Sequence, residues 1–147
     1  MSVYLPDVNV LIAVVWPSHI HHRIAREWFS MEARSGWATC PFTQAGFIRI
    51  SSNPAIITDA VSPREAIAVL TRLTDVGQHE FWRDELSCAE RNELPVDLLI
   101  GHRQVTDAYL LGLAILNEGR LATMDRGIMG LLPTKSHLRT AIELIST

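Results

Sequence analysis

Three aspartates stand at positions from which their carboxylates could act together. Asp7 directly follows a short apolar stretch that predicts a strand, and Asp125 comes two residues after another such stretch, Leu121–Thr123. Asp107 falls in the first turn of a predicted helix, where the helix dipole tolerates negative charge. Carboxylates brought together repel each other and usually need a cation, and oxygen ligands favour Mg²⁺ or Mn²⁺ over Zn²⁺. The three residues therefore predict a divalent-cation site.

Each aspartate taken alone has a structural alternative. Asp7 could cap the helix that follows it, and Asp107 could stabilise a helix N-terminus. Asp125 precedes Arg126 and Gly127 and could be a turn residue. Their joint placement around an otherwise apolar sheet favours a shared site, because unpaired carboxylates are costly to gather without a cation.

The elements that must position these acids alternate between strands and helices. The predicted strands are 3–5, 37–39, near 80–82, 121–123 and 141–145. The predicted helices are 8–15, 21–33, 43–51, one from Pro63 after the capping residue Ser62, 95–100 and 104–117. Parallel neighbours need such crossover helices, so the predicted fold class is α/β, a three-layer α/β/α sandwich with a mostly parallel, about five-stranded sheet. Such sheets bind ligands at the carboxyl ends of strands where strand order reverses.

Length and charge limit the organisation and the partners. The 147 residues predict a single domain, residues 1–147, and 48% hydrophobic with 20% charged residues is a globular balance. The net charge is −3, with one lysine among the 13 basic residues, so a strongly basic nucleic-acid surface is absent. Arginines beside the aspartate segments could still contact phosphate, or could be solvated surface side chains. These candidates are Arg49, Arg103 and Arg126.

The chain shows no membrane or secretion signal. The longest apolar stretches, Val10–Trp16 and Tyr109–Leu116, are far shorter than the roughly 20 residues of a membrane helix. The N-terminus lacks the pattern of a signal peptide, so we expect a cytoplasmic protein. Cys40 and Cys88 have no metal-like spacing and are expected to be reduced thiols in that compartment.

Four segments, in order over nearly the whole chain, resemble a known family. They are Leu5–Ile12, Thr39–Ile50, Val105–Leu110 and Leu121–Gly127. These segments resemble the PIN-domain motifs of VapC toxins from bacterial toxin–antitoxin pairs. The resemblance implies a divalent-metal site, hydrolysis of RNA phosphodiester bonds by an endoribonuclease, a homodimer, and a separate antitoxin protein whose peptide covers the site.

The resemblance also implies roles for single residues. Asp7, Asp107 and Asp125 match the family's metal-ligating aspartates. The candidate support residues within the same segments are Asn9, Thr106 and Thr123. One Mg²⁺ would be fully balanced by three carboxylates, and a second only in part, so the number of metal ions stays open.

Gln44 departs from the family pattern, because many PIN domains carry a glutamate at this position. Its neutral amide oxygen could still contact the metal or its water, with weaker Mg²⁺ binding. The alternative is an amide that only hydrogen-bonds locally at a helix start. The first interpretation makes Gln44 a fourth candidate catalytic residue.

The histidines and tryptophans predict other roles. His19, His21 and His22 lack a partner at metal-ligand spacing, and adjacent helical residues point in different directions. His102 could orient phosphate or transfer a proton, although a loop histidine with local hydrogen bonds is the simpler interpretation. The tryptophans predict core or partner contacts, and the stretch from Trp16 through the 21–33 helix is the expected antitoxin or dimer surface.

Other classes fit less well. A haloacid-dehalogenase-type phosphatase needs an acid where Asn9 stands, and a receiver domain needs adjacent acids and a late lysine, for which Lys135 is poor support. A dinucleotide-binding domain would show a G-x-G-x-x-G turn, which the sequence lacks. The main alternative is non-enzymatic: a metal-impaired PIN-like module that binds RNA or a protein.

Overall fold

A parallel sheet forms the centre of the protein. The computed structural model describes residues 2–90 and 94–147. The strands are β1 (Tyr4–Pro6), β2 (Trp37–Thr39), β3 (His79–Phe81), β4 (Arg120–Thr123) and β5 (Ile142–Leu144). Their order in the sheet is β3-β2-β1-β4-β5, and every neighbouring pair is parallel. The predicted five-stranded α/β fold is confirmed, and the sheet is parallel throughout.

Helices connect the strands. The α-helices are α1 (Val8–Val15), α2 (His22–Trp28), α3 (Pro41–Ser51), α4 (Pro63–Leu73) and α5 (Val105–Leu116). A π-helical turn, η1 (Phe29–Ala33), continues α2, and the 3₁₀ turns are η2 (His102–Gln104), η3 (Arg126–Leu131) and η4 (His137–Ala141). No helix in the described ranges has both the length and the apolar character that crossing a membrane requires.

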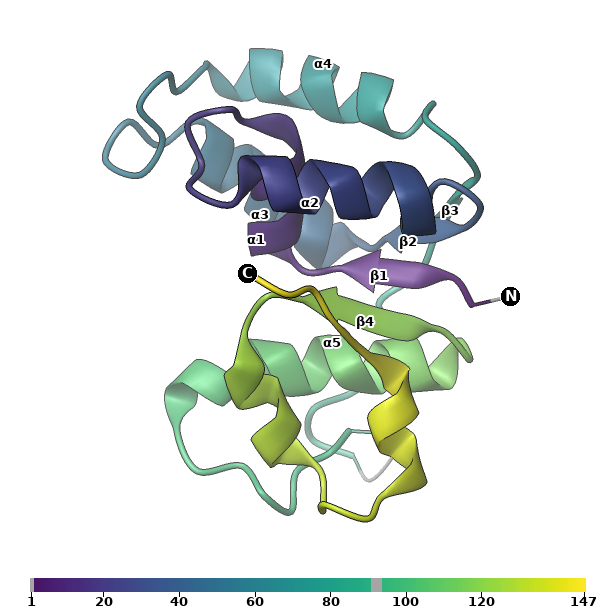
Figure 1. The fold of residues 1–147 in the computed structure, drawn as a ribbon. Helices are drawn as coiled ribbons and strands as arrows, with labels where there is room; N and C mark the ends of the chain where they lie inside the picture. The colour runs from purple at the N-terminus through teal and green to yellow at the C-terminus, as the bar shows by residue number, and fades with distance from the viewer. Residues whose placement is uncertain (1, 91–93) are drawn as a thin grey trace.

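The helices cover both faces of the sheet, as a three-layer sandwich requires. Figure 1 shows α1 to α4 on one side of β1 and β4, and α5 on the other. Two apolar cores match these layers: one gathers residues of α1, α2 and α3 around Trp37, and the other packs α5 against Leu5 and Leu121. The central strands β1, β2 and β4 are therefore buried on both faces, which explains their short apolar stretches, whereas the edge strand β3 is largely exposed.

The strand order reverses between β1 and β4. From β1 the chain moves outward to β2 and β3, and it then returns to place β4 on the other side of β1. The register pairs Leu5 with Leu121 and Pro6 with Ala122, so the two strands end side by side. Asp7 and Asp125 follow these two ends, at the position where open α/β sheets bind their ligands.

Most predicted elements match the structure, and one does not. The 8–15 helix and the 37–39 strand have the predicted bounds, and α4 begins after Ser62, whose side chain accepts a hydrogen bond from the Glu65 N–H. The helix predicted over 95–100 is wrong, because these residues form an irregular segment with a turn at 97–98. Val96 and Ile100 are exposed there, Ile100 by 93%, and although Leu99 packs against the core, so short a segment buries too little surface to stay helical.

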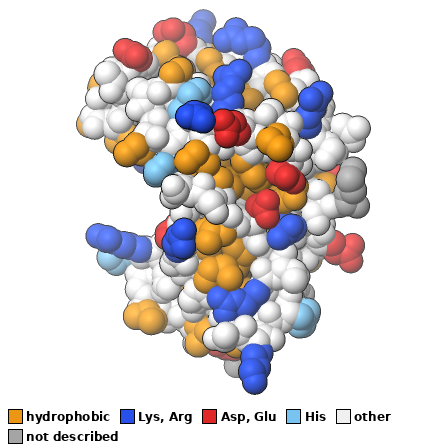
Figure 2. Space-filling model, in the orientation of Figure 1, with side chains coloured by type: hydrophobic (Ala, Val, Ile, Leu, Met, Phe, Trp, Pro, Cys, Tyr) orange, Lys and Arg blue, Asp and Glu red, His pale blue; other side chains and the backbone are white. Residues whose placement is uncertain are grey.

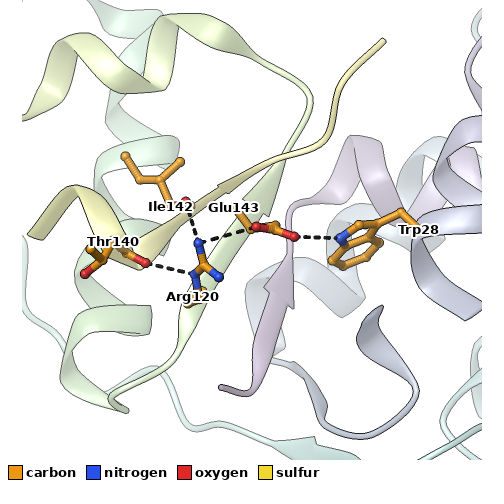
Figure 3. A network of polar contacts seen from close by, with 5 residues as sticks. All are labelled: Trp28, Arg120, Thr140, Ile142 and Glu143. Carbon is orange, nitrogen blue, oxygen red and sulfur yellow. Dashed lines mark hydrogen bonds and ion pairs between the residues drawn. The ribbon is translucent and has the colours of Figure 1, made fainter. Parts of the chain in front are cut away.

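A polar network fastens the edge strand β5 to the rest of the fold (Figure 3). The Glu143 carboxylate accepts a hydrogen bond from Trp28 Nε1 at 3.2 Å and pairs with Arg120 at 3.4 Å. Arg120 also donates to the carbonyls of Thr140 and Ile142. The network joins α2, β4 and β5. Trp28 is a core residue, one of the two roles predicted for the tryptophans, and its indole N–H is hydrogen-bonded.

The second turn of α3 packs closely against the start of α1. A Cβ atom at Gly46 would lie 2.6 Å from Cγ2 and 3.2 Å from Cγ1 of Val8, a β-branched side chain with little rotamer freedom. We expect the steric clash in Gly46→Ala to destabilise the fold by about 1–3 kcal/mol. This loss exceeds the stabilisation that the higher helix propensity of alanine provides. Urea unfolding measures this change, and adding Val8→Ala should restore much of the loss.

A matched glycine variant separates this contact from a general effect. A Cβ atom at Gly130 meets no atom within 4 Å, so Gly130→Ala should leave the unfolding midpoint unchanged or slightly higher. Equal midpoints for Gly46→Ala and the unsubstituted protein would refute the close approach of α3 to α1.

Candidate active site

The three candidate aspartates line one cavity at the carboxyl edge of the sheet. Its volume is about 510 Å³, and it lies between α1, α3 and α5. Figure 2 shows the surface hollowed at the left of the view, where the β1 arrow of Figure 1 points, with basic side chains and histidines at the edge of the hollow. The polar residues that line the cavity are Asp7, Asn9, Arg49, Thr106, Asp107 and Asp125.

Asp7 is the most deeply placed of the three acids. Its side chain is 8% exposed, and Oδ1 accepts a hydrogen bond from the Val10 N–H at 2.8 Å, which caps α1. Burial raises the pKa of Asp7, the hydrogen bonds from Thr123 and Val10 oppose that change, and the charge of Asp125 adds to it. The capping role that the sequence left as an alternative is therefore real, and it coexists with the cavity position.

Thr123, the last residue of β4, connects two of the acids. Its hydroxyl hydrogen-bonds the Asp7 carboxylate, and its Oγ1 accepts the Asp125 N–H at 3.1 Å. Asp125 itself is exposed and caps η3, with Oδ1 accepting the Gly127 N–H at 2.8 Å. One carboxylate oxygen of Asp125 is thus engaged locally, as a turn residue would be, while the residue still lines the cavity.

Asp107 carries the clearest electrostatic sign that the acids are close together. Desolvation by burial, together with the charges of Asp7 and Asp125, raises its pKa from 3.8 to about 6. The residue lies in the first turn of α5 and is partly buried. A bound cation would relieve this situation, in which burial and two neighbouring carboxylates favour the neutral form of Asp107.

The acids do not yet form a finished ligand set. Within residues 2–90 and 94–147, no group of three His, Cys, Asp or Glu side chains is arranged as it stands to hold a metal ion. In Asp7 and in Asp125, one carboxylate oxygen accepts the backbone N–H of a helix cap. The negative charges of the acids also oppose a closer approach of the three side chains to one another. The donor chemistry suits a divalent cation, and the three carboxylates would have to move together around it.

Gln44 makes a local hydrogen bond through its amide nitrogen. Its Nε2 donates to Thr39 Oγ1 at 2.9 Å, and Thr39 Oγ1 also contacts His79 Nε2 at 2.8 Å. Gln44 is not among the residues that line the cavity. The local hydrogen bond considered as the alternative for this amide is present in the structure.

The cavity face of α3 is formed by other residues. They are Phe42, Ala45, Gly46, Arg49 and Ile50. Their spacing of i, i+3, i+4, i+7 and i+8 is one face of an α-helix, and Gln44 is turned away from it at about 100° per residue. The periodicity of these residues in the sequence is the signal that predicts this face, once the helix is turned so that its apolar side faces the three aspartates.

The remaining candidates divide between the cavity and its surroundings. Arg49 and Thr106 line the cavity, whereas Arg103 and Arg126 are exposed and are not lining residues. Asn9 lines the cavity beside Asp7, and its Oδ1 is 3.0 Å from His19 Nε2. Sequence reasoning considered His19 only as a metal ligand and missed this contact, because a turn between two helices brings the residues together.

The fold and the site together define the class of protein. A parallel α/β sandwich with three aspartates around one cavity, at the point where strand order reverses, is the arrangement expected of a PIN domain. Comparison with known proteins takes the assignment further. No protein-family model matches the chain.

Curated relatives from Mycobacterium tuberculosis align with nearly the full length of the chain. Ribonuclease VapC38 of strain H37Rv is 45% identical over 142 residues, 97% of each chain. Ribonuclease VapC39 of strain CDC 1551 is 43% identical over 84% of this chain and 89% of its own, and ribonuclease VapC44 of the same strain is 40% identical over 92% and 97%. The chain belongs to the VapC family of ribonucleases, and the resemblance predicted from its four segments is confirmed.

Proposed function

We propose that this chain is a single-domain, metal-dependent endoribonuclease that hydrolyses RNA phosphodiester bonds as the toxin of a toxin–antitoxin pair. One observation carries the proposal: Asp7, Asp107 and Asp125 line the same cavity, and their charges act on one another. The ribonuclease names of its relatives support the same activity.

The proposed cofactor is Mg²⁺, with Mn²⁺ as an effective substitute. Asp7, Asp107 and Asp125 would hold it, since hard oxygen donors suit these ions. A divalent cation supplies Lewis-acid activation of water and neutralises negative charge on a phosphate. With Gln44 bonded to Thr39, three carboxylates balance one such ion, and we propose a single metal ion per site.

The side chains around the aspartates have complementary roles in this proposal. Thr123 keeps Asp7 and Asp125 in register through its two hydrogen bonds. Arg49, on the cavity face of α3, offers a planar donor fork to phosphate oxygens, and Thr106 offers a hydroxyl from the start of α5. Arg103 and Arg126, outside the cavity, are proposed to contact the flanking RNA backbone.

The proposed partners follow from the family and from the surface. We propose a cytoplasmic homodimer that is inhibited by a separate antitoxin protein. Ile20 and Met31 are 88% and 77% exposed, in the segment from Trp16 through η1 that was predicted to contact a partner. Exposed apolar side chains of this size favour a protein contact there.

Two glutamate substitutions on α3 test which face of this helix lies towards the proposed metal ion. We expect Ala45→Glu to tighten Mg²⁺ binding by about ten-fold, because it adds a negative charge to the cavity lining. Gln44→Glu should not tighten binding, because it faces Thr39 and only loses a donated hydrogen bond. Calorimetric Mg²⁺ titration compares the two, and tighter binding by Gln44→Glu would return Gln44 to the metal shell.

Cleavage of total RNA by purified protein tests the proposed activity. The protein is assayed with Mg²⁺, with Mn²⁺ and with EDTA, after circular dichroism has shown that it is folded and mass spectrometry that it is free of antitoxin. We expect discrete fragments with either metal and none with EDTA. Intact RNA under all three conditions would instead support the alternative, a PIN-like module that binds RNA or protein with an impaired metal site.

A further inference from the structure

The hydrogen bonds of His19 fix its protonation state by geometry. His19 lies in the turn between α1 and α2, and its Nδ1 accepts the His21 backbone N–H at 2.9 Å. A ring nitrogen that accepts a hydrogen bond carries no proton, so in the neutral ring the N–H is on Nε2. Burial and the neighbouring His21 and His22 lower the pKa of His19, which favours the neutral ring.

The fixed tautomer in turn orients Asn9. His19 Nε2 is 3.0 Å from Asn9 Oδ1, so the ring donates and the amide oxygen accepts. The two N–H bonds of Asn9 Nδ2 are thereby directed away from His19, and Nδ2 has no hydrogen-bond partner among residues 2–90 and 94–147. Because Asn9 lines the cavity with Asp7, an unused double donor is held beside the acids.

The turn that carries His19 is itself held against α1. The His19 backbone N–H donates to the Trp16 carbonyl at 3.0 Å. Nδ1 of the His22 ring is 2.7 Å from the Ala13 carbonyl oxygen. The rings of His19 and His21 are also in contact, with centroids 5.8 Å apart. The histidine-rich turn therefore presents one ring nitrogen to Asn9 from a fixed position.

We propose that His19 is a positioning residue that holds the Asn9 amide so that Nδ2 donates to a non-bridging oxygen of the RNA phosphate. The proposal rests on the ribonuclease function proposed above. A phosphate that enters a cavity lined by three carboxylates needs donors that do not compete with the cation, and a neutral amide meets that need. A donor fixed before the substrate binds requires no reorganisation during the reaction.

Four variants test the coupling between the two residues. His19→Ala removes the donor to Asn9, and His19→Gln restores an N–H close to the place of Nε2. Asn9→Ala removes the proposed phosphate donor, and the double variant measures whether the two effects are shared. His137→Ala, an exposed histidine outside the cavity, is the control.

Cleavage kinetics and one spectroscopic readout give the outcome. We expect His19→Ala to lower kcat/KM about ten-fold, as supporting hydrogen bonds at metal sites do. His19→Gln should recover most of it, and the double variant should be no worse than Asn9→Ala. In metal-free protein, the side-chain ¹H–¹⁵N pair of Asn9 should shift in His19→Ala and not in His137→Ala.

The failures of the two proposals are distinguishable. Additive losses in the double variant, or unchanged kcat/KM in His19→Ala of an active enzyme, would overturn the role of His19 alone. An unchanged chemical shift of the Asn9 side-chain amide in His19→Ala would also overturn the role of His19, whatever the cleavage activity. A wild-type protein that cleaves no RNA, with the amide shift still present, would overturn the ribonuclease proposal and leave only the hydrogen bond.

Discussion

Asp7→Asn is expected to abolish RNA cleavage and leave the protein folded. The substitution removes the negative charge that lies deepest in the cavity, and with it a proposed ligand of the cation. Hydrogen-bond partners of metal ligands alone account for 10–100-fold in activity or affinity, so loss of a ligand should cost at least about 100-fold. Fragment analysis of RNA incubated with Mg²⁺ measures the loss.

The structure explains why this variant should fold. The asparagine keeps an Oδ1 that can accept the Val10 N–H, so the cap of α1 survives. Because burial raises the pKa of Asp7, a neutral side chain also removes a buried charge. Asp75→Asn, an exposed aspartate after α4, is the matched control and should cleave normally. Full activity of Asp7→Asn at unchanged circular dichroism would remove Asp7 from the catalytic site.

Asp107→Asn is expected to inactivate the enzyme and to stabilise the metal-free protein. Asp107 has a pKa of about 6 in the fold and 3.8 as its ordinary value, so the folded protein binds this proton more tightly than the unfolded chain does. Folding therefore loses stability as the pH rises from about 4 to about 6, and the whole penalty is present at pH 7. Asparagine carries no charge and escapes the penalty.

The size and pH range of this effect can be measured. A pKa difference of about two units corresponds to roughly 3 kcal/mol, and solvent screening of a partly exposed side chain reduces the expected gain to about 1–2 kcal/mol. In EDTA at pH 7.5, this predicts a Tm higher by about 3–6 °C for Asp107→Asn, with little difference at pH 4. Mg²⁺ should raise the Tm of the wild type and not that of the variant. A variant less stable than the wild type in EDTA at pH 7.5 would contradict the penalty that burial and the neighbouring acids place on the Asp107 charge.

The sequence predicted elements well where local signals are strong. The start of α4 follows from Ser62, Pro63 and Glu65, because a capping box depends on neighbouring residues alone. The strands were predicted to within about two residues. For the central strands the reason is that short apolar stretches between helices are typical of a buried parallel sheet. Asp7 and Asp125 were placed at the sheet edge for the same reason.

What the sequence did not predict depends on contacts between distant elements. The apolar residues of 95–100 suggested a helix, but Val96, Leu98 and Ile100 are exposed while Leu99 packs against the core, and the segment is irregular. The direction of Gln44 depends on which face of α3 meets α1, and this is set by the close packing of Gly46 on Val8. The bond from His19 to Asn9 requires the geometry of a turn, which periodicity does not describe.

The most direct test of the account is a crystal structure of the protein soaked in Mn²⁺, with anomalous difference density to locate the ion. We predict one strong peak in the cavity, with carboxylate oxygens of Asp7, Asp107 and Asp125 at about 2.0–2.3 Å and with the three side chains closer together than in the metal-free fold. Absence of a peak between these aspartates at millimolar Mn²⁺, or a peak at the His19–His22 turn instead, would contradict the proposed metal site and the ribonuclease mechanism built on it.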